Sequence, residues 1–227
     1  MCFWKNNKLQ NVMIIDYIKR GGKILAENNG AILVEDNISH VVCLSAIDEN
    51  CGKEVLTALN AYRSLVLSQP LMLEYVREKY NLTYAHACYQ GVYTSSKPLT
   101  LTDALDIRLA NDKEIEIIMQ TYQFADIREL NFARKRNMLF TAHADGKFCG
   151  YIGEHREGSM GMLHVFPQFR ERGYATDIES FLINKKLLDG SIPYCHIIDD
   201  NVASLNLQRK LGLDIAPEKI YWVSKAE

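Results

Sequence analysis

A basic turn with a glycine separates a predicted strand from a predicted helix in the second half of this 227-residue sequence. The turn occupies residues 170–176. Gly173 allows a ligand to approach the backbone closely, and the helix that begins near Tyr174 directs its free N–H groups to the same place. Arg170 and Arg172 add positive charge. The pattern is typical of a site for a diphosphate group that is held mainly by backbone donors.

Two more residues of the turn suit this ligand, and two elements must position it. Ala175 keeps side-chain bulk away from the diphosphate, and Thr176 offers a hydroxyl donor. Residues 160–165 are mostly apolar and predict the strand before the turn. The helix after the turn is expected to end at Gly190, because glycine tolerates a left-handed helix end.

The rest of the sequence predicts a mixed α/β unit in each half of the chain. The polar segment 95–102 contains a proline and predicts a boundary between a domain of residues 1–102 and a domain of residues 103–227. Hairpin turns are indicated at Asn29-Gly30 and at Asp145-Gly146. The predicted strands cover residues 23–27, 31–35, 40–47, 65–67, 87–93, 105–109, 138–143, 148–155, 160–165, 192–198 and 220–223. The predicted helices cover residues 12–19, 54–63, 71–80, 111–122, 127–135, 174–188 and 201–211.

Composition narrows the classes of partner. The chain has 26 basic and 28 acidic residues, and its net charge of -2 favours neither a nucleic acid nor an anionic membrane as partner. No apolar run reaches the roughly 18 residues of a membrane span, and the N-terminus lacks a signal peptide's apolar core, so a cytoplasmic location is expected. The cysteines and histidines show no metal-ligand spacing, and no metal is expected.

Two motifs together identify a family that this sequence resembles. The first is Arg170-Glu171-Arg172-Gly173-Tyr174-Ala175, and the second is Asn201-Val202-Ala203-Ser204-Leu205-Asn206-Leu207-Gln208-Arg209-Lys210-Leu211-Gly212-Leu213. Their order and separation resemble the GNAT superfamily of acyl-CoA-dependent N-acyltransferases, most closely its glycine-N-acyltransferase-like branch. The resemblance covers about residues 105–223.

This resemblance implies a fold and an activity. The fold would be α/β (α+β), with a mixed, mostly antiparallel central sheet flanked by helices and a degenerate GNAT-like N-terminal half that shapes the acceptor cleft. The activity would be N-acetyltransfer from acetyl-CoA to a primary amine of a small molecule or amino acid, by a monomer or homodimer. The residues that would bind the coenzyme are Leu163, His164, Val165, Arg170, Glu171, Arg172, Gly173, Tyr174, Ala175, Thr176, Asn201 and Ser204.

The catalytic groups depart from the family pattern at two positions. Gln208 stands where many relatives have a tyrosine that protonates the departing thiolate, and Ser159 stands where many have a glutamate. Strand alternation would put Glu157 on the same face as Ser159, so Glu157 is the first candidate for the general base and Glu154 the second. The thiolate would leave unassisted or take a proton from water. The backbone at residues 163–165 would stabilise the oxyanion.

Other polar residues favour structural roles. His164 is expected to be a partly buried wall residue, and Tyr194 and Tyr221 are expected to be core residues rather than substitute proton donors. His143 and His155 lie at strand ends and are expected to face solvent.

Two other functions remain open. A non-catalytic CoA-binding sensor or interaction module would explain the two departures from the family pattern. A nucleotide-binding protein is disfavoured, because no Lys-Ser or Lys-Thr follows Gly173.

Overall fold

The computed structural model describes residues 3–60, 64–122 and 126–225. Its contacts divide the chain into two compact units. The first unit holds residues 1–92, 196–209 and 213–227, and the second holds residues 93–195 and 210–212. Each unit is made of more than one segment of the chain, so no single boundary separates them. The domain boundary predicted at residue 102 stays a prediction.

The predicted fold class is confirmed: the fold is mixed α/β, with a mostly antiparallel sheet flanked by helices. In the first unit the strands are paired in the order β1-β2-β3-β4-β12-β5, and β11 pairs with β5. Among these described strands, β3 and β4 pair in parallel, and the pairs β1–β2, β2–β3, β4–β12, β12–β5 and β11–β5 are antiparallel. These strands are β1 (Lys23–Glu27), β2 (Ala31–Glu35), β3 (Val42–Ala46), β4 (Ser64–Leu67), β5 (Tyr84–Val92), β11 (Asp214–Ile215) and β12 (Ile220–Ser224).

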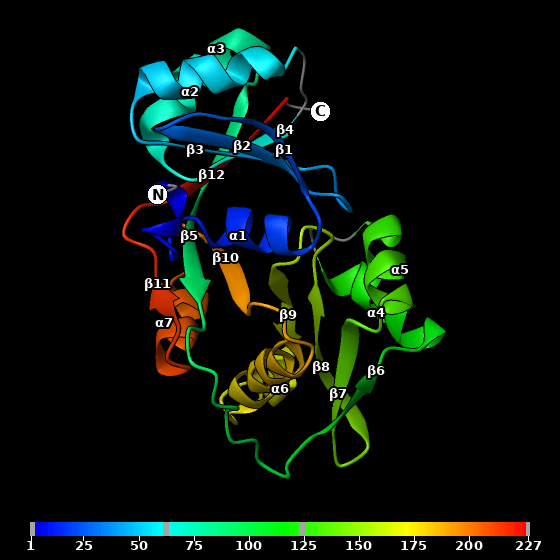
Figure 1. The fold of residues 1–227 in the computed structure, drawn as a ribbon. Helices are drawn as coiled ribbons and strands as arrows, with labels where there is room; N and C mark the ends of the chain where they lie inside the picture. Colours follow the sequence, from blue (N-terminus) through cyan, green and yellow to red (C-terminus); the bar gives the residue numbers. More distant parts are fainter. Residues whose placement is uncertain (1–2, 61–63, 123–125, 226–227) are drawn as a thin grey trace. The chain divides into compact units, whose positions relative to one another are not determined.

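Helices cover both faces of the β2–β3 hairpin (Figure 1), since α2 and α3 lie on one side and α1 on the other. The β2 and β3 residues alternate between these two faces, and nearly all of them are buried. The helical elements of this unit are η1 (Phe3–Lys5), α1 (Val12–Lys19), α2 (Glu49–Val55), η2 (Leu56–Ala58), η3 (Pro70–Met72) and α3 (Leu73–Tyr80), and α7 (Val202–Lys210) belongs to it up to residue 209.

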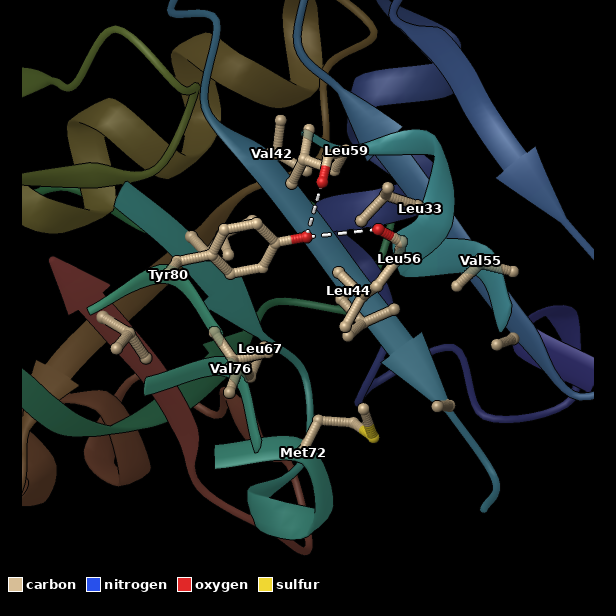
Figure 2. Packing of buried hydrophobic residues seen from close by; sticks show 14 of the residues in the cluster. Leu33, Val42, Leu44, Val55, Leu56, Leu59, Leu67, Met72, Val76 and Tyr80 are labelled. Carbon is tan, nitrogen blue, oxygen red and sulfur yellow. Dashed lines mark hydrogen bonds between the residues drawn. The ribbon is translucent and has the colours of Figure 1, made fainter. Parts of the chain in front are cut away.

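The core of the first unit is an aliphatic cluster with one anchored phenol (Figure 2). Leu33 and Leu44 from the hairpin meet Leu56 and other helical residues there. The Tyr80 hydroxyl donates to the carbonyl oxygens of Leu56 and Leu59 at 3.2 and 2.8 Å. The single hydroxyl hydrogen is shared between these two carbonyls. The Leu56 carbonyl also accepts from the Leu59 N–H at 3.2 Å, so Tyr80 links α3 to the end of η2.

The second unit is an antiparallel sheet with one parallel strand at its end. Its antiparallel order is β6-β7-β8-β9, and β10 pairs with β9 in parallel through Cys195 and Met160. Leu139 and Tyr151 pack on one face against α4 and α5, whereas Phe140 contacts Phe181 of α6 from the other. The elements are β6 (Asp106–Leu109), α4 (Asp112–Thr121), α5 (Ile127–Lys135), β7 (Leu139–Ala144), β8 (Lys147–Glu154), β9 (Met160–Val165), η4 (Pro167–Phe169), α6 (Tyr174–Leu188) and β10 (Tyr194–Ile198), whose last three residues belong to the first unit.

The polar segment around residues 99–102 is bound to α6. The backbone N–H of Leu99 donates to Asn184 Oδ1 at 2.7 Å, and Asn184 Nδ2 donates to the Leu99 carbonyl at 2.8 Å. About two helical turns earlier, Asp177 accepts hydrogen bonds from the backbone N–H and the hydroxyl of Thr102. The segment therefore packs along the helix that follows the glycine turn.

Most predicted elements are present within a few residues, and one helix prediction was wrong at its start. The helix predicted from Glu54 begins at Glu49, because the Asp48 carboxylate caps it by accepting from the Cys51 N–H at 2.9 Å. The predicted end was also wrong, because the α-helix ends at Val55, a 3-10 turn continues to Ala58, and Leu59 is extended. Residues 61–63 of the predicted helix lie outside the described residues. Among the helices that the structure describes, none has the length and apolar character needed to cross a membrane.

Candidate functional site

The N-terminus of α6 is open, as the glycine turn predicts. Gly173 is its N-cap residue, with a φ of 83°, and no side chain caps the helix. The N–H groups of Thr176 and Asp177 donate to the Gly173 carbonyl at 2.9 and 3.3 Å. A Cβ added at Gly173 would meet no atom within 4 Å, so this backbone borders open space. The first N–H groups of α6 therefore suit an anionic ligand.

The corresponding turn in the first unit leads into a helix whose N-terminus is capped by a side chain. There the strand β3 leads into α2, and the Asp48 carboxylate already occupies a donor at the helix N-terminus. A carboxylate at that place repels a phosphate and satisfies the amide that would bind it. Only the α6 turn of this pair is thus suited to a diphosphate.

Three basic side chains surround the α6 turn. Arg170 is exposed, and its Nε donates to the Val165 carbonyl at 3.0 Å. Arg172 is also exposed and lies 5.9 Å from the ring centroid of Phe169. Lys210 Nζ donates to the Thr176 hydroxyl at 3.3 Å. Lys210 was not predicted as a site residue, although it belongs to the late-helix motif, and this motif was the signal that could have identified it.

The strand β9 carries a bulge before the turn. Tyr151 pairs with His164 and Gly153 with Gly161, so β9 has one residue more than β8 between these pairs. Met162 has a φ of 57° at this point. A bulge takes backbone groups out of the regular ladder, which suits the backbone role predicted for residues 163–165.

His164 is partly buried on β9, as predicted, whereas its place in the wall of a binding pocket stays a prediction. Its ring stacks on Tyr151 with centroids 5.2 Å apart and an interplanar angle of 12°. Burial and the nearby Arg170 charge lower the pKa of His164. The imidazole is therefore neutral at pH 7. A Cβ added at Gly150, on the neighbouring strand, would lie 2.5 Å from the His164 carbonyl, so Gly150 is what lets β9 approach so closely.

Glu157 lies beside Ser159, but not for the predicted reason. Glu157 belongs to the turn between β8 and β9 and not to a strand, so alternation along a strand does not position it. Its side chain is buried, and Ser159 donates to its Oε1 at 2.5 Å. Burial raises the pKa of Glu157, whereas the His155 charge and the Ser159 hydrogen bond lower it. A carboxyl with a raised pKa suits a general base at neutral pH.

Glu154 has a different environment. It forms a buried ion pair with Lys186, which also donates to the Gly158 carbonyl at 2.8 Å. The Tyr194 hydroxyl donates to the Glu157 carbonyl at 2.8 Å. These contacts give Tyr194 the structural role predicted for it, and they tie the turn that carries Glu157 to α6 and β10.

Two histidines expected to face solvent are in fact paired with carboxylates. His143 is buried, and its Nε2 lies 3.0 Å from Glu114 Oε1. His155 Nδ1 lies 2.5 Å from Glu129 Oε1, and its side chain is only 23% exposed. The partners lie on helices distant in sequence, and no local pattern indicated the pairing.

The late-helix residues have local roles in the first unit. Asn201 Oδ1 accepts from the Ser204 N–H at 3.1 Å and so caps the start of α7. Gln208 is buried on the same helix. The predicted contacts of Asn201 and Ser204 with a coenzyme stay predictions, as does the absence of a metal.

Comparisons with known proteins agree with this architecture. The sequence model of the FR47-like protein family matches residues 139–223, from β7 into β12. Among solved structures, the chain is similar to a Drosophila protein with a TM-score of 0.70 and 13% identity, over 96% of this chain and 90% of that one. No curated protein matches the sequence significantly.

Two structural relatives carry names that describe an activity. A GCN5-related N-acetyltransferase-like protein from Streptococcus suis matches with a TM-score of 0.57 and 14% identity, over 96% of this chain and 97% of that one. A GCN5-related N-acetyltransferase from Kribbella flavida matches with a TM-score of 0.55 and 8% identity, over 100% and 97%. At these identities the similarity shows the fold: the chain has the fold of GCN5-related N-acetyltransferases (GNAT).

Proposed function

We propose that this protein is an N-acyltransferase that moves an acyl group, with acetyl as the expected group, from a CoA thioester to a primary amine. The observation that carries the proposal is the uncapped N-terminus of α6 behind Gly173, at the end of the bulged strand β9. The GNAT fold supports it, because the same order of strand, turn and helix defines the expected coenzyme site. The acceptor we propose is a small molecule or amino acid, as in the glycine-N-acyltransferase-like branch.

The residues around the turn fit a CoA diphosphate. Backbone donors at residues 173–175 would hold its oxygens, because the Thr176 N–H already donates to the Gly173 carbonyl. Arg170, Arg172 and Lys210 would add positive charge. Strand β9 would pair with the pantetheine amides as an added strand does. The bound thioester would supply an activated acyl group. The backbone near the bulge would donate to the oxyanion that forms from it.

Glu157 is the proposed general base. Its carboxylate would accept one proton from the acceptor's ammonium group, giving a neutral amine and a neutral carboxyl that later returns the proton to water. Glu154 is the less suitable candidate, because Lys186 already neutralises it. The thiolate is a good leaving group and needs no tyrosine at position 208.

Calorimetry and a thiol assay test the proposal in sequence. The first expected result is heat of binding and a higher Tm with CoA or acetyl-CoA. The second is release of free thiol that depends on an amine from a library of small amines and amino acids. No heat and no Tm change at millimolar CoA, with a folded sample, would refute the proposal. Binding without thiol release for any amine would instead support the CoA-binding sensor.

A further inference from the structure

Three side chains from distant parts of the second unit meet next to the turn that carries Glu157. They are Glu129 on α5, His155 after β8, and Glu157 itself. One polar side-chain atom from each lies within 4.8 Å of those of the other two. Glu129 is 25% exposed, and Glu157 is buried. The three side chains therefore form a cluster that extends from the buried Glu157 carboxyl to the partly exposed Glu129 carboxylate.

The imidazole of His155 packs closely against Gly161 and contacts Glu129. A Cβ added at Gly161, on the neighbouring strand, would overlap the ring. On the other side, His155 Nδ1 contacts Glu129 Oε1 at 2.5 Å. Burial alone would lower the pKa of His155, but the Glu129 hydrogen bond and the charges of Glu157, Glu129 and Glu154 raise it to about 9. His155 is thus an imidazolium at neutral pH.

The imidazolium acts on a carboxyl that burial would otherwise neutralise. Burial is the largest influence on the pKa of Glu157 and raises it, and the His155 charge is the first influence that lowers it. The Glu129 charge also raises this pKa, but it is the smallest of the influences, so the pair as a whole favours the ionised carboxyl. The Ser159 hydroxyl acts in the same direction through its hydrogen bond to Oε1. A base must be unprotonated to accept a proton, so the His155 charge extends the working range of Glu157 to lower pH.

We propose that Glu129 and His155 are positioning residues, and that their charged pair holds Glu157 in the ionised, proton-accepting form. The catalytic part of this inference rests on the proposed function, because Glu157 serves as a base only if the protein transfers an acyl group to an amine. The charge effect itself belongs to the folded protein without any substrate. Two other groups act on these residues: Glu154, which is paired with Lys186, and Tyr122 at the end of α4. Nearby, the Tyr194 hydroxyl donates to the Glu157 carbonyl, and the Arg156 guanidinium lies 5.3 Å from the Phe132 ring.

The test compares the titration of Glu157 in the wild type and in His155→Gln. In the full chain, labelled with ¹³C at the glutamate carboxyl and treated with a chelator, NMR follows the Glu157 signal, which Glu157→Gln identifies by its loss. The expected result is a midpoint higher by about 1–3 pH units in His155→Gln, because the carboxyl loses a nearby opposite charge. An unchanged midpoint overturns the proposal. His143→Gln is the matched control, because it removes another carboxylate-paired histidine outside this cluster, and its midpoint should stay at the wild-type value.

A second variant covers the case in which His155→Gln does not fold. In Glu129→Gln, the imidazole should titrate well below the wild-type value of about 9, as seen in the His155 ring signals. A wild-type midpoint there would remove Glu129 from the pair and overturn the proposal.

A kinetic readout links the pair to turnover. In His155→Gln, the acidic limb of the kcat/KM profile should move up by the same interval as the Glu157 midpoint, while the plateau at higher pH is retained. A purely structural role would lower the rate at every pH and leave the limb in place, which would contradict the proposal. If no acyl transfer is found at all, the proposed function fails, and the NMR midpoints still decide the charge effect.

Discussion

At the scale of single residues, two glutamates of the second unit have the same carboxyl group and opposite surroundings. Ser159 donates to Glu157, which lies next to a histidine, whereas Glu154 is neutralised by direct contact with Lys186. The Lys186 ammonium already occupies the Glu154 carboxylate, and removing one partner of a buried ion pair leaves the other charge uncompensated. The two residues should therefore fail in different ways when they are changed.

Changing Glu157 should affect turnover. Glu157→Gln keeps the size of the side chain and an acceptor for Ser159, but it cannot take a proton, so we expect kcat to fall by about 100-fold or more. The measurement is thiol release at saturating acetyl-CoA and amine. Tm and CoA affinity should stay close to the wild-type values. Turnover near the wild-type level would exclude Glu157 as the base.

Changing Glu154 should affect stability. Glu154→Gln leaves the Lys186 ammonium buried without its counter-charge, so we expect the free energy of unfolding to fall by about 3–5 kcal/mol. Urea denaturation followed by fluorescence measures it. Glu116→Gln, a change at an exposed glutamate of α4, is the control and should have little effect. If Glu154→Gln were as stable as the wild type but lost turnover, Glu154 would become the better candidate for the base.

At the scale of elements, the two strand–turn–helix units of the chain differ in one decisive feature. Strand β3 enters α2 through Asp48, whose carboxylate caps the helix, and strand β9 enters α6 through Gly173 with no side-chain cap. The first turn stabilises its own helix, and the second leaves its donors to a ligand. The coenzyme-binding role that we propose for the second turn alone thus depends on the residue at the helix start.

Gly173→Ala should separate binding from stability. Alanine in the left-handed region costs about 1–2 kcal/mol, and its Cβ would enter the open space in front of α6, so we expect CoA affinity to fall by about tenfold or more. Gly190→Ala is a matched control, because Gly190 follows the same helix, has a φ of 68° and also borders open space. It should lower stability similarly and leave the CoA dissociation constant unchanged in calorimetry. Equal losses of affinity in both variants would contradict the assigned site.

At the scale of the whole molecule, the first unit is completed by the end of the chain. Strand β12 lies between β4 and β5 and pairs with both, and Val223 is fully buried in the core that Figure 2 shows in part. The strands of this unit thus come from both ends of the sequence. Folding of the unit must therefore wait for a contact between distant segments, and its loop-closure entropy opposes that contact.

Truncation after Lys219 should abolish cooperative folding of the first unit. The loss of β12 leaves the edges of β4 and β5 unpaired and opens the core at Val223. Calorimetry should show a smaller unfolding enthalpy, and near-UV circular dichroism should lose signal. Truncation after Lys225 is the control and should keep the wild-type transition. A wild-type Tm without β12 would contradict this account of the unit.

Stability should also fall as the pH rises through the range of His155. The pKa of His155 is about 9 in the folded chain, against 6.5 for the free side chain, so the folded state binds more protons between these values. Protonated His155 therefore adds up to about 3 kcal/mol to the free energy of unfolding. This contribution is complete below pH 6.5 and is lost as the pH rises through about 9. Urea unfolding at several pH values measures it. His155→Gln should flatten the dependence in this window, and an equally steep fall in that variant would assign it to other groups.

Local patterns were sufficient for most elements and for the glycine turn. The helices at Val12–Lys19 and Ile127–Lys135 and the strand at Met160–Val165 have their predicted bounds, because their periodicity and caps act over a few neighbouring residues. Asn111 caps α4 in a capping box with Glu114, as its position predicts. The start of α2 was missed because the helix was predicted from Glu54, and the Asp48 side chain that caps its start was not recognised.

The order of residues along the chain thus specified the elements, the left-handed glycine and the open helix start, because these depend on backbone preferences within a few residues. It did not specify which carboxyl would be buried beside which cation. Lys186 meets Glu154, Glu129 meets His155, and Lys210 meets Thr176 across 32, 26 and 34 positions, and each pairing exists because the fold brings separate elements together. Protonation depends on burial and on neighbouring charge, and both arise only when the chain has folded.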